Sequence, residues 1–357
     1  MKFSYTKEYG ETDKRTFNLS PELRYGWSNK HWNGHVAMNY RYNTKRLAVI
    51  SADAGTDAVQ FNGAKPISEL VNSIYTLIDR KNFMKLYEKK YISAGHVSEI
   101  VNGLGFGLFA EYSERSTLSN TTDYSLYKAH GREYTSNIPV TPATTVVDFP
   151  THHALILEAK ARIRFGQTFI TRPEGKYIMG TEYPTIRLAF RKGIPTVGDV
   201  DFDYFKASIE DDMRAGLLGK LSYVVSYGQF LSSRRLFFPD YIHFNGNKTF
   251  LSDFRLAEYK NLDYYTYSTS RWAMEAHAEH NFGGFFLNKI PIIRKLKLQE
   301  IAGFHFLKTK TLEQYLEFSL GFEKLGVFRA DIFTSFTGKQ RGTIGFMLGI
   351  KKSFGAN

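Results

Sequence analysis

Apolar and charged side chains alternate along residues 155–165, and this period constrains the fold more than any other feature of the chain. The apolar members are Leu155, Leu157, Ala159, Ala161, Ile163 and Phe165, and the charged members are Glu158, Lys160, Arg162 and Arg164. Successive side chains of a strand point to opposite faces, so the segment predicts a strand with one apolar and one wet face. The same alternation returns along the whole chain, for example at residues 316–322 and 328–336. We therefore predict an all-β fold, a transmembrane antiparallel β-barrel.

Composition agrees with a barrel and excludes a helical membrane protein. The sequence holds no run of about 18 apolar residues, the length that a spanning helix needs. Its mean hydropathy of -0.33 resembles that of a soluble protein, because alternation hides the apolar face from an average. The 30 Phe and 23 Tyr suit aromatic girdles at two membrane interfaces. The alternative interpretation is a large soluble β-sandwich or propeller.

Strand counting predicts one domain over residues 1–357. About fifteen alternating segments are recognisable, and single-chain bacterial barrels use even numbers, so sixteen strands are expected. The missing strand is either unrecognised or precedes Met1. Residues 1–9 already alternate as a strand and show no signal peptide, whereas an exported barrel requires one. We expect the chain to be a mature or truncated part of a longer precursor.

Three segments depart from the strand period. Ile67, Leu70, Val71, Ile74, Leu77 and Ile78 follow helical spacing after Pro66, which predicts a short amphipathic helical insertion over residues 66–90. Such a helix either caps the barrel mouth, lies on the membrane or packs under its own loop. Residues 116–153 and 232–270 are too long for hairpin turns and are predicted to be long loops on the functional side.

The net charge indicates which kinds of partner the chain can bind. A net charge of +12 favours contact with anionic outer-membrane lipid and lipopolysaccharide. Nucleic acid is not expected as a partner, since the basic residues are spread over lumen-facing positions and form no single patch. The absence of cysteine excludes disulfides, a thiol nucleophile and zinc–thiolate sites. No cofactor is expected.

The wet faces of the predicted strands supply the candidate site, a mixed-charge lumen network. Its members are Glu158, Lys160, Arg162, Arg164, Arg187, Arg191, Glu275, His277, Glu279, Arg329 and Asp331. Glu275, His277 and Glu279 invite a metal interpretation, but their spacing of about 6 to 7 Å along one strand face disfavours chelation. His152 and His153 lack a recognisable nucleophile and acid, so we expect no enzyme. A mixed-charge interior suits an open channel and a translocator equally well.

Several non-repetitive stretches resemble one known family. They are residues 81–88, 111–124, 149–155, 238–247 and 264–307, the last with Ala-His-Ala-Glu-His-Asn-Phe at 276–282 and Leu-Asn-Lys-Ile-Pro at 287–291. The chain resembles, over nearly its whole length, the C-terminal outer-membrane barrel of a Bacteroidota family of unknown function. Members of that family carry a carboxypeptidase-regulatory-like domain upstream. The resemblance implies a barrel located in the outer membrane of a Gram-negative cell.

That barrel is more distantly similar to the BamA-type surface-antigen superfamily, chiefly in the last five strands and residues 289–296. In the superfamily a loop with a Val-Arg-Gly-Phe signature enters the lumen, and residues 232–270 lack this signature. The candidate lumen-loop residues in its place are His243, Phe244, Asn245, Gly246, Asn247 and Arg255. The resemblance implies assistance in the insertion, translocation or anchoring of envelope proteins. The alternatives are a structural barrel subunit that binds partners through its long loops, or a passive channel.

Overall fold

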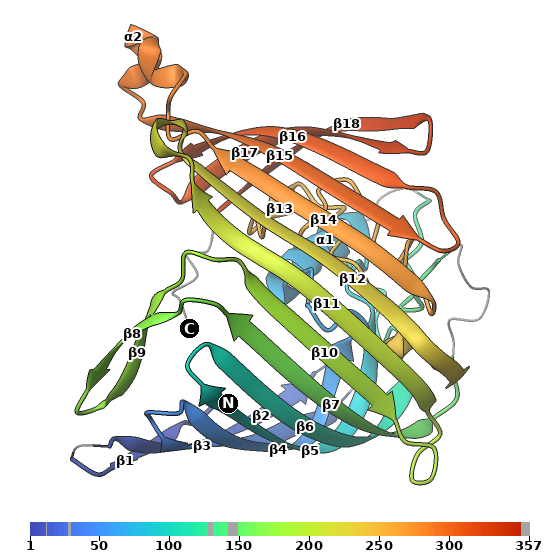
Figure 1. Ribbon diagram of the computed structural model, residues 1–357. Helices are drawn as coiled ribbons and strands as arrows, with labels where there is room; N and C mark the ends of the chain where they lie inside the picture. Colours follow the sequence, from blue (N-terminus) through green and yellow to red (C-terminus); the bar gives the residue numbers. More distant parts are fainter. Residues whose placement is uncertain (12, 28–29, 128–130, 142–148, 351–357) are drawn as a thin grey trace.

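The computed structural model describes residues 1–11, 13–27, 30–127, 131–141 and 149–350, and it consists mainly of one curved sheet (Figure 1). The sheet has sixteen strands in the order β1 to β7, β10 to β12, β14 to β18 and β13, which confirms the predicted all-β class and strand number. The first seven are β1 Tyr5–Tyr9, β2 Arg15–Gly26, β3 His31–Asn43, β4 Ala48–Gln60, β5 Leu86–Val101, β6 Leu104–Thr117 and β7 His152–Arg164. The next three are β10 Thr185–Gly193, β11 Asp201–Arg214 and β12 Lys220–Arg235. The last six are β13 Leu251–Ser252, β14 Trp272–Asn281, β15 Leu298–Thr309, β16 Tyr315–Lys324, β17 Phe328–Thr337 and β18 Gln340–Ile350.

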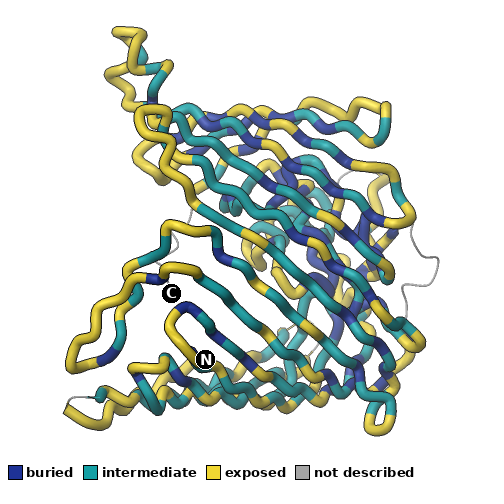
Figure 2. Tube along the Cα trace, viewed as in Figure 1, coloured by how far each residue is buried: buried dark blue, intermediate teal, exposed yellow. Residues whose placement is uncertain are grey.

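Two small elements project from the wall. The hairpin of β8, Thr168–Arg172, and β9, Gly175–Gly180, forms a separate two-stranded sheet that the sequence pattern did not predict. The connection between β14 and β15 carries α2, Pro291–Arg294. Figure 2 shows both projections coloured mainly as exposed. Neither contributes to the sixteen-stranded sheet.

The wall is an antiparallel meander that is interrupted at one place. Every wall strand pairs antiparallel with the next, whereas β13 belongs to a loop and pairs parallel to β18. Fifteen of the sixteen strands thus form the wall, and β1 and β18 run in the same direction. Two such strands cannot close an antiparallel sheet directly. In the described part of the chain β1 and β18 form no ladder, and we call the space between them the seam.

Strand β13 occupies part of the β18 edge at the seam. Leu251 and Ser252 pair with Leu348 and Gly349, and the Leu348 amide donates to the carbonyl of Phe250 at 2.8 Å. A Cβ atom at Gly349 would lie 1.8 Å from the Ser252 carbonyl oxygen. Only glycine therefore permits this approach of the two backbones.

Burial on the wall is inverted relative to a soluble protein. On β16, Leu320 is 68% exposed and its neighbour Phe318 is 46% exposed, whereas Glu317 is 0% exposed. On β17, Ile332 is 56% exposed and Arg329 only 2%. Soluble proteins almost never bury charged side chains while exposing apolar neighbours along the same strand. The alternation thus places apolar side chains outside and charged ones inside.

Helix α1, Glu69–Asp79, is shorter than the predicted insertion over residues 66–90. Ser68 caps its first turn by accepting from the Val71 amide, and Arg80 ends it in the left-handed conformation at φ 54°. The chain then returns to the wall, and β5 begins at Leu86. The predicted continuation of the helix through this point is wrong, because Leu86 pairs with Gln60 of β4.

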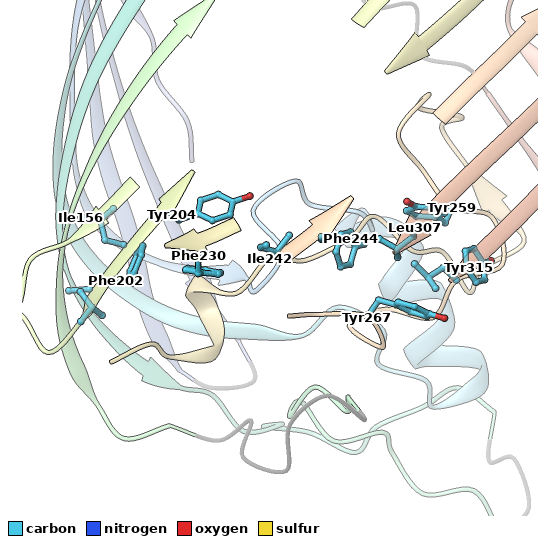
Figure 3. Packing of buried hydrophobic residues seen from close by; sticks show 14 residues of the cluster. Ile156, Phe202, Tyr204, Phe230, Ile242, Phe244, Tyr259, Tyr267, Leu307 and Tyr315 are labelled. Carbon is cyan, nitrogen blue, oxygen red and sulfur yellow. The ribbon is translucent and has the colours of Figure 1, made fainter. Parts of the chain in front are cut away.

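The largest buried apolar cluster lies inside the curve of the sheet and not between two layers. Its central part is the connection between β12 and β14, residues 236–271, which we call the lumen loop. Figure 3 shows Ile242, Phe244, Tyr259 and Tyr267 of this loop between the two sides of the wall. The wall residues of the cluster include Ile156, Phe202, Tyr204 and Phe230 on one side and Leu307 and Tyr315 on the other. The lumen loop thus crosses the interior and fills part of it.

Candidate functional site

The predicted lumen-loop residues fold the loop itself. Asn62 of the β4–α1 connection donates to the Phe244 carbonyl at 3.0 Å and to Asn245 Oδ1 at 3.1 Å. Asn247 donates to Glu258 at 2.7 Å and accepts from the Thr249 amide at 2.7 Å. These amide side chains satisfy backbone groups that the irregular loop would otherwise bury without partners.

Gly246 and Arg255 also stabilise the folded lumen loop. A Cβ atom at Gly246 would lie 2.5 Å from the Leu262 carbonyl oxygen, so glycine allows two segments of the loop to touch. Arg255 pairs with Asp253 and donates to the Ala64 carbonyl at 2.9 Å. The position of Arg255 therefore ties the loop to the segment before α1.

His243 is partly buried and held in one tautomer. A backbone carbonyl only accepts, so Nε2 carries the proton and donates to the Phe238 carbonyl at 3.0 Å. Nδ1 then accepts from the Ser268 hydroxyl at 2.8 Å. Burial lowers the pKa of His243 to about 4, so the imidazole is neutral at pH 7.

A first anchor joins the start of the lumen loop to the N-terminal half of the wall. Arg115 of β6 donates through Nη1 to both oxygens of Asp240 at 2.9 Å, and Arg191 of β10 lies 3.6 Å from the same carboxylate. Arg115 and Asp240 are 3% and 1% exposed. Such charge-assisted bonds away from water hold a loop strongly in one place.

A second anchor joins the end of the loop to the C-terminal half. Glu317 of β16 accepts from the backbone amides of Lys260 at 2.7 Å and Asn261 at 2.8 Å, and from the Tyr315 hydroxyl at 2.7 Å. Its carboxylate thus replaces the water that these amides would otherwise bind.

The Lys260 side chain extends this second anchor into the predicted network. Its Nζ donates to Glu279 at 3.3 Å and to His305 Nε2 at 3.0 Å, and it lies 3.7 Å from Asp331. Arg329 forms two bonds of 2.7 to 2.9 Å to Glu279 and two of 2.7 Å to Asp331. Two cations therefore face two carboxylates at the point where the loop meets β14 and β17.

Two imidazoles continue from Lys260. His305 accepts from Lys260 at Nε2, so its Nδ1–H donates to Nδ1 of His277 at 2.9 Å. The second nitrogen of His277 then lies 3.6 Å from Glu275. Hydrogen bonds thus link Lys260, His305 and His277, and the contact with Glu275 is longer than a hydrogen bond. No set of three His, Cys, Asp or Glu residues in the described ranges is arranged to hold a metal ion.

The structure divides the predicted lumen network into two groups. Glu279, Arg329 and Asp331 meet around Lys260, while His277 is linked to Lys260 through His305 and lies 3.6 Å from Glu275. Glu158, Lys160, Arg162, Arg164, Arg187 and Arg191 line β7 and β10 on the other side of the wall. Of this second group, Arg191 is the one member in the described residues with an ion pair to the lumen loop.

Sequence reasoning missed the residues that hold the loop. Lys260 and Asp240 lie in the long loop, where no period shows which way a side chain points, and Arg115, His305 and Glu317 look like ordinary wet-face positions of their strands. Their partners are far away in sequence, 125 residues apart for Arg115 and Asp240. The local sequence carries no signal of such a pairing at Lys260, which lies between Tyr259 and Asn261 in a mixed polar segment.

The chain was compared with protein families, curated sequences and solved structures. No curated protein sequence matches the chain. The crystal structure of BamA from Haemophilus ducreyi lacking POTRA domains 1–3 is similar with a TM-score of 0.49 and 10% sequence identity, over 97% of this chain and 68% of that one. A family model described as the C-terminal domain of a family of unknown function (DUF5686) matches residues 1–322. The chain therefore belongs to the DUF5686 C-terminal domain family.

Proposed function

We propose that this protein is an integral outer-membrane β-barrel that assists the insertion, translocation or anchoring of other envelope proteins. The observation that carries the membrane part is the inverted wall, with Leu320 and Ile332 exposed outside and Arg329 buried inside. A hydrocarbon solvent stabilises the outer set, and the hydrogen-bond ladders between neighbouring wall strands leave few backbone groups for lipid to contact away from the seam. Among the described residues, no helix is long and apolar enough to span a membrane.

The seam supports the second part of the proposal. An unpaired strand edge presents free amide and carbonyl groups that can pair with an added strand. Within the described ranges, β1 and β18 leave such edges, and two residues of β13 pair with the β18 side. We propose that an envelope protein passing through or docking on the barrel displaces β13 and pairs with β18.

The partners that follow from this role are outer-membrane lipid, lipopolysaccharide and other envelope proteins. The role requires no cofactor and no catalytic residue. The proposed source, a Gram-negative bacterium of the Bacteroidota, and a regulatory-like domain upstream rest on the sequence resemblance. A passive channel is the alternative, and the lumen loop opposes it because its anchors cross the interior.

The chain contains no cysteine, so an introduced pair provides a clean test. Leu251→Cys with Leu348→Cys joins β13 to β18, whose residues 251 and 348 are partners. We expect the oxidised double variant to lower the level of other outer-membrane proteins in cells that depend on it, and a reductant to restore them. The matched control is Leu320→Cys with Ile332→Cys, which joins two strands that are already paired in the wall.

The outcome of this test decides the role. Full activity with the β13–β18 bond closed contradicts displacement of β13. Steady, large conductance of the purified protein in planar bilayers, with simple ion selectivity, favours the passive channel over the proposed function.

A further inference from the structure

A cavity of about 490 Å³ is lined by β5, β6, β7, β10 and β11, and its charged side chains belong to the wet face of β7, β10 and β11. Four cationic side chains line it, Lys160, Arg162, Arg187 and Lys206. The other lining residues in the described chain carry no charge: Val97, Gly105, Phe106, Gly107, Phe109, Ala161, Leu188, Ala189 and Ser208. No lumen-loop residue lines this cavity, so the loop leaves it open to the interior.

Strand register concentrates the positive charge. Arg162 lies directly opposite Arg187 on β10, a like-charge pair that destabilises a sheet. On its other side Arg162 faces Gly105, and a Cβ atom there would lie 3.5 Å from Arg162 Nη2. Lys160 faces Gly107 and Ala189. Small residues thus leave open space beside the cationic groups.

The carboxylates near Arg162 form their ion pairs with other cations. Lys160 pairs with Glu158 at 2.7 Å, and Arg187 donates through Nε to Glu210 at 2.8 Å. Lys206 is only 3.9 Å from Glu275, a loose contact. Arg162 has no hydrogen bond or ion pair to any described residue. The wall therefore presents an unpaired guanidinium beside three more cations.

We propose that this cavity binds a water-soluble oligophosphate-type anion, with Arg162 as its principal contact. A guanidinium presents a planar fork that matches two oxygens of a phosphoryl group, and the neighbouring ammonium groups supply further charge. The volume lies within the range of small-molecule sites. The cationic side chains lie on the same face of the wall as Arg191, and Arg191 contacts the lumen loop through Asp240. This face is therefore the one turned to the lumen, from which a dissolved anion reaches the cations. The proposal stands independently of any role in protein insertion.

Isothermal titration of the purified, detergent-solubilised chain with tripolyphosphate at about 50 mM salt tests the site, since low salt preserves the attraction. We expect saturable binding that Arg162→Gln weakens about tenfold, as loss of a charge-assisted bond implies. Arg172→Gln, in the projecting β8–β9 hairpin, is the matched control and should bind like the unchanged protein. Arg162→Gln also removes the repulsion from Arg187, so its unfolding temperature should not fall.

Three results would overturn the proposal. They are no tripolyphosphate binding at low salt, equal affinity in Arg162→Gln, and tighter binding of a short-chain phosphatidate than of tripolyphosphate. The last result would assign the cavity to a lipid headgroup. Lys206→Gln gives an independent measurement if Arg162→Gln does not fold, and it too should weaken binding.

Discussion

At the residue scale, single ionised groups hold the lumen loop in place. Glu317 is the clearest case, because one buried carboxylate accepts from two loop amides and a tyrosine hydroxyl. Glu317→Gln replaces one accepting oxygen by an NH₂ group that faces an N–H donor. We expect a loss of about 1–3 kcal/mol in the stability of the docked loop, the cost of leaving a buried polar group unsatisfied. Hydrogen exchange at the Lys260 and Asn261 amides measures this directly, and unchanged protection would contradict it.

Lys260 offers a second residue-scale prediction. Lys260→Met keeps the length of the side chain but leaves Glu279 and Asp331 with Arg329 as their remaining cation. Because breaking a buried pair strands an opposite charge, we expect the loop to lose roughly 3 kcal/mol and to become sensitive to protease. Lys248→Met, at a half-exposed pair of 3.9 Å with Asp263, should have little effect.

His243 makes loop docking depend on pH. Its pKa is about 4 in the folded protein and 6.5 normally, because burial disfavours the imidazolium; Asp240 raises the pKa and Arg191 lowers it, both to a smaller extent. The released loop therefore binds a proton more readily. The contribution to stability is complete above about pH 6.5 and is lost progressively as the pH falls towards 4, by roughly 3 kcal/mol.

Limited proteolysis of the lumen loop at pH 7.5 and 4.5 checks this expectation. His243→Gln can still donate to the Phe238 carbonyl and accept from Ser268, but it does not titrate. We expect cleavage at low pH to increase in the unchanged protein and much less in this variant. An equal increase in both would assign the effect to another group.

At the element scale, the pairing of β13 with β18 depends on one glycine. Gly349→Ala would place a methyl carbon 1.8 Å from the Ser252 carbonyl oxygen, so β13 has to leave the edge. In the 251–348 cysteine pair described above, we expect this change to abolish disulfide formation. Gly63→Ala, where a Cβ would meet no atom within 4 Å and φ is not positive, is a control for the substitution itself. Efficient cross-linking of the Gly349→Ala variant would show that the edge contact is looser than the structure indicates.

Sequence could predict wall elements far better than elements defined by distant partners. Residues 155–165 and 316–322 predict their strands by a local period, because each side chain faces either the bilayer or the wet interior. β13 has only two residues and exists because Leu348 and Gly349 lie beside it, which no local pattern records. The predicted helix extends too far because Leu86 and Tyr87 continue its apolar spacing, although pairing with β4 determines their conformation.

The candidate site shows the same division. The period predicts Glu279, Arg329 and Asp331 on the wet faces of their strands, and the structure brings Glu279 of β14 to Arg329 of β17 across β15 and β16, while Asp331 pairs with Arg329 within β17. It could not identify Lys260 as the group they surround, because the path of the lumen loop results from packing across the interior.

At the scale of the whole molecule, the inverted wall predicts how substitutions act. Leu320→Arg would place a cation on the outer face, at a cost of about 2–4 kcal/mol if that face lies at mid-membrane. If the same face met water, a surface substitution would change stability by only about 0.5 kcal/mol. Unfolding from lipid vesicles, compared with Leu325→Arg in the β16–β17 turn, separates the two cases. Equal, small effects at both positions would contradict a transmembrane wall.

The lumen loop also bears on how the molecule is assembled. Its first anchor joins it to β6, its second to β16, and Asn62 bonds to it across 182 residues of sequence. Contacts between such distant segments form late and slowly, because the intervening chain has to be ordered first. The lumen loop therefore connects the two halves of the wall from inside, across a sheet whose first and last strands form no ladder. It sets the width of the wall, which such a ladder would otherwise set. We expect the wall to curve and the lumen loop to dock in a single cooperative step, so that neither structure forms without the other.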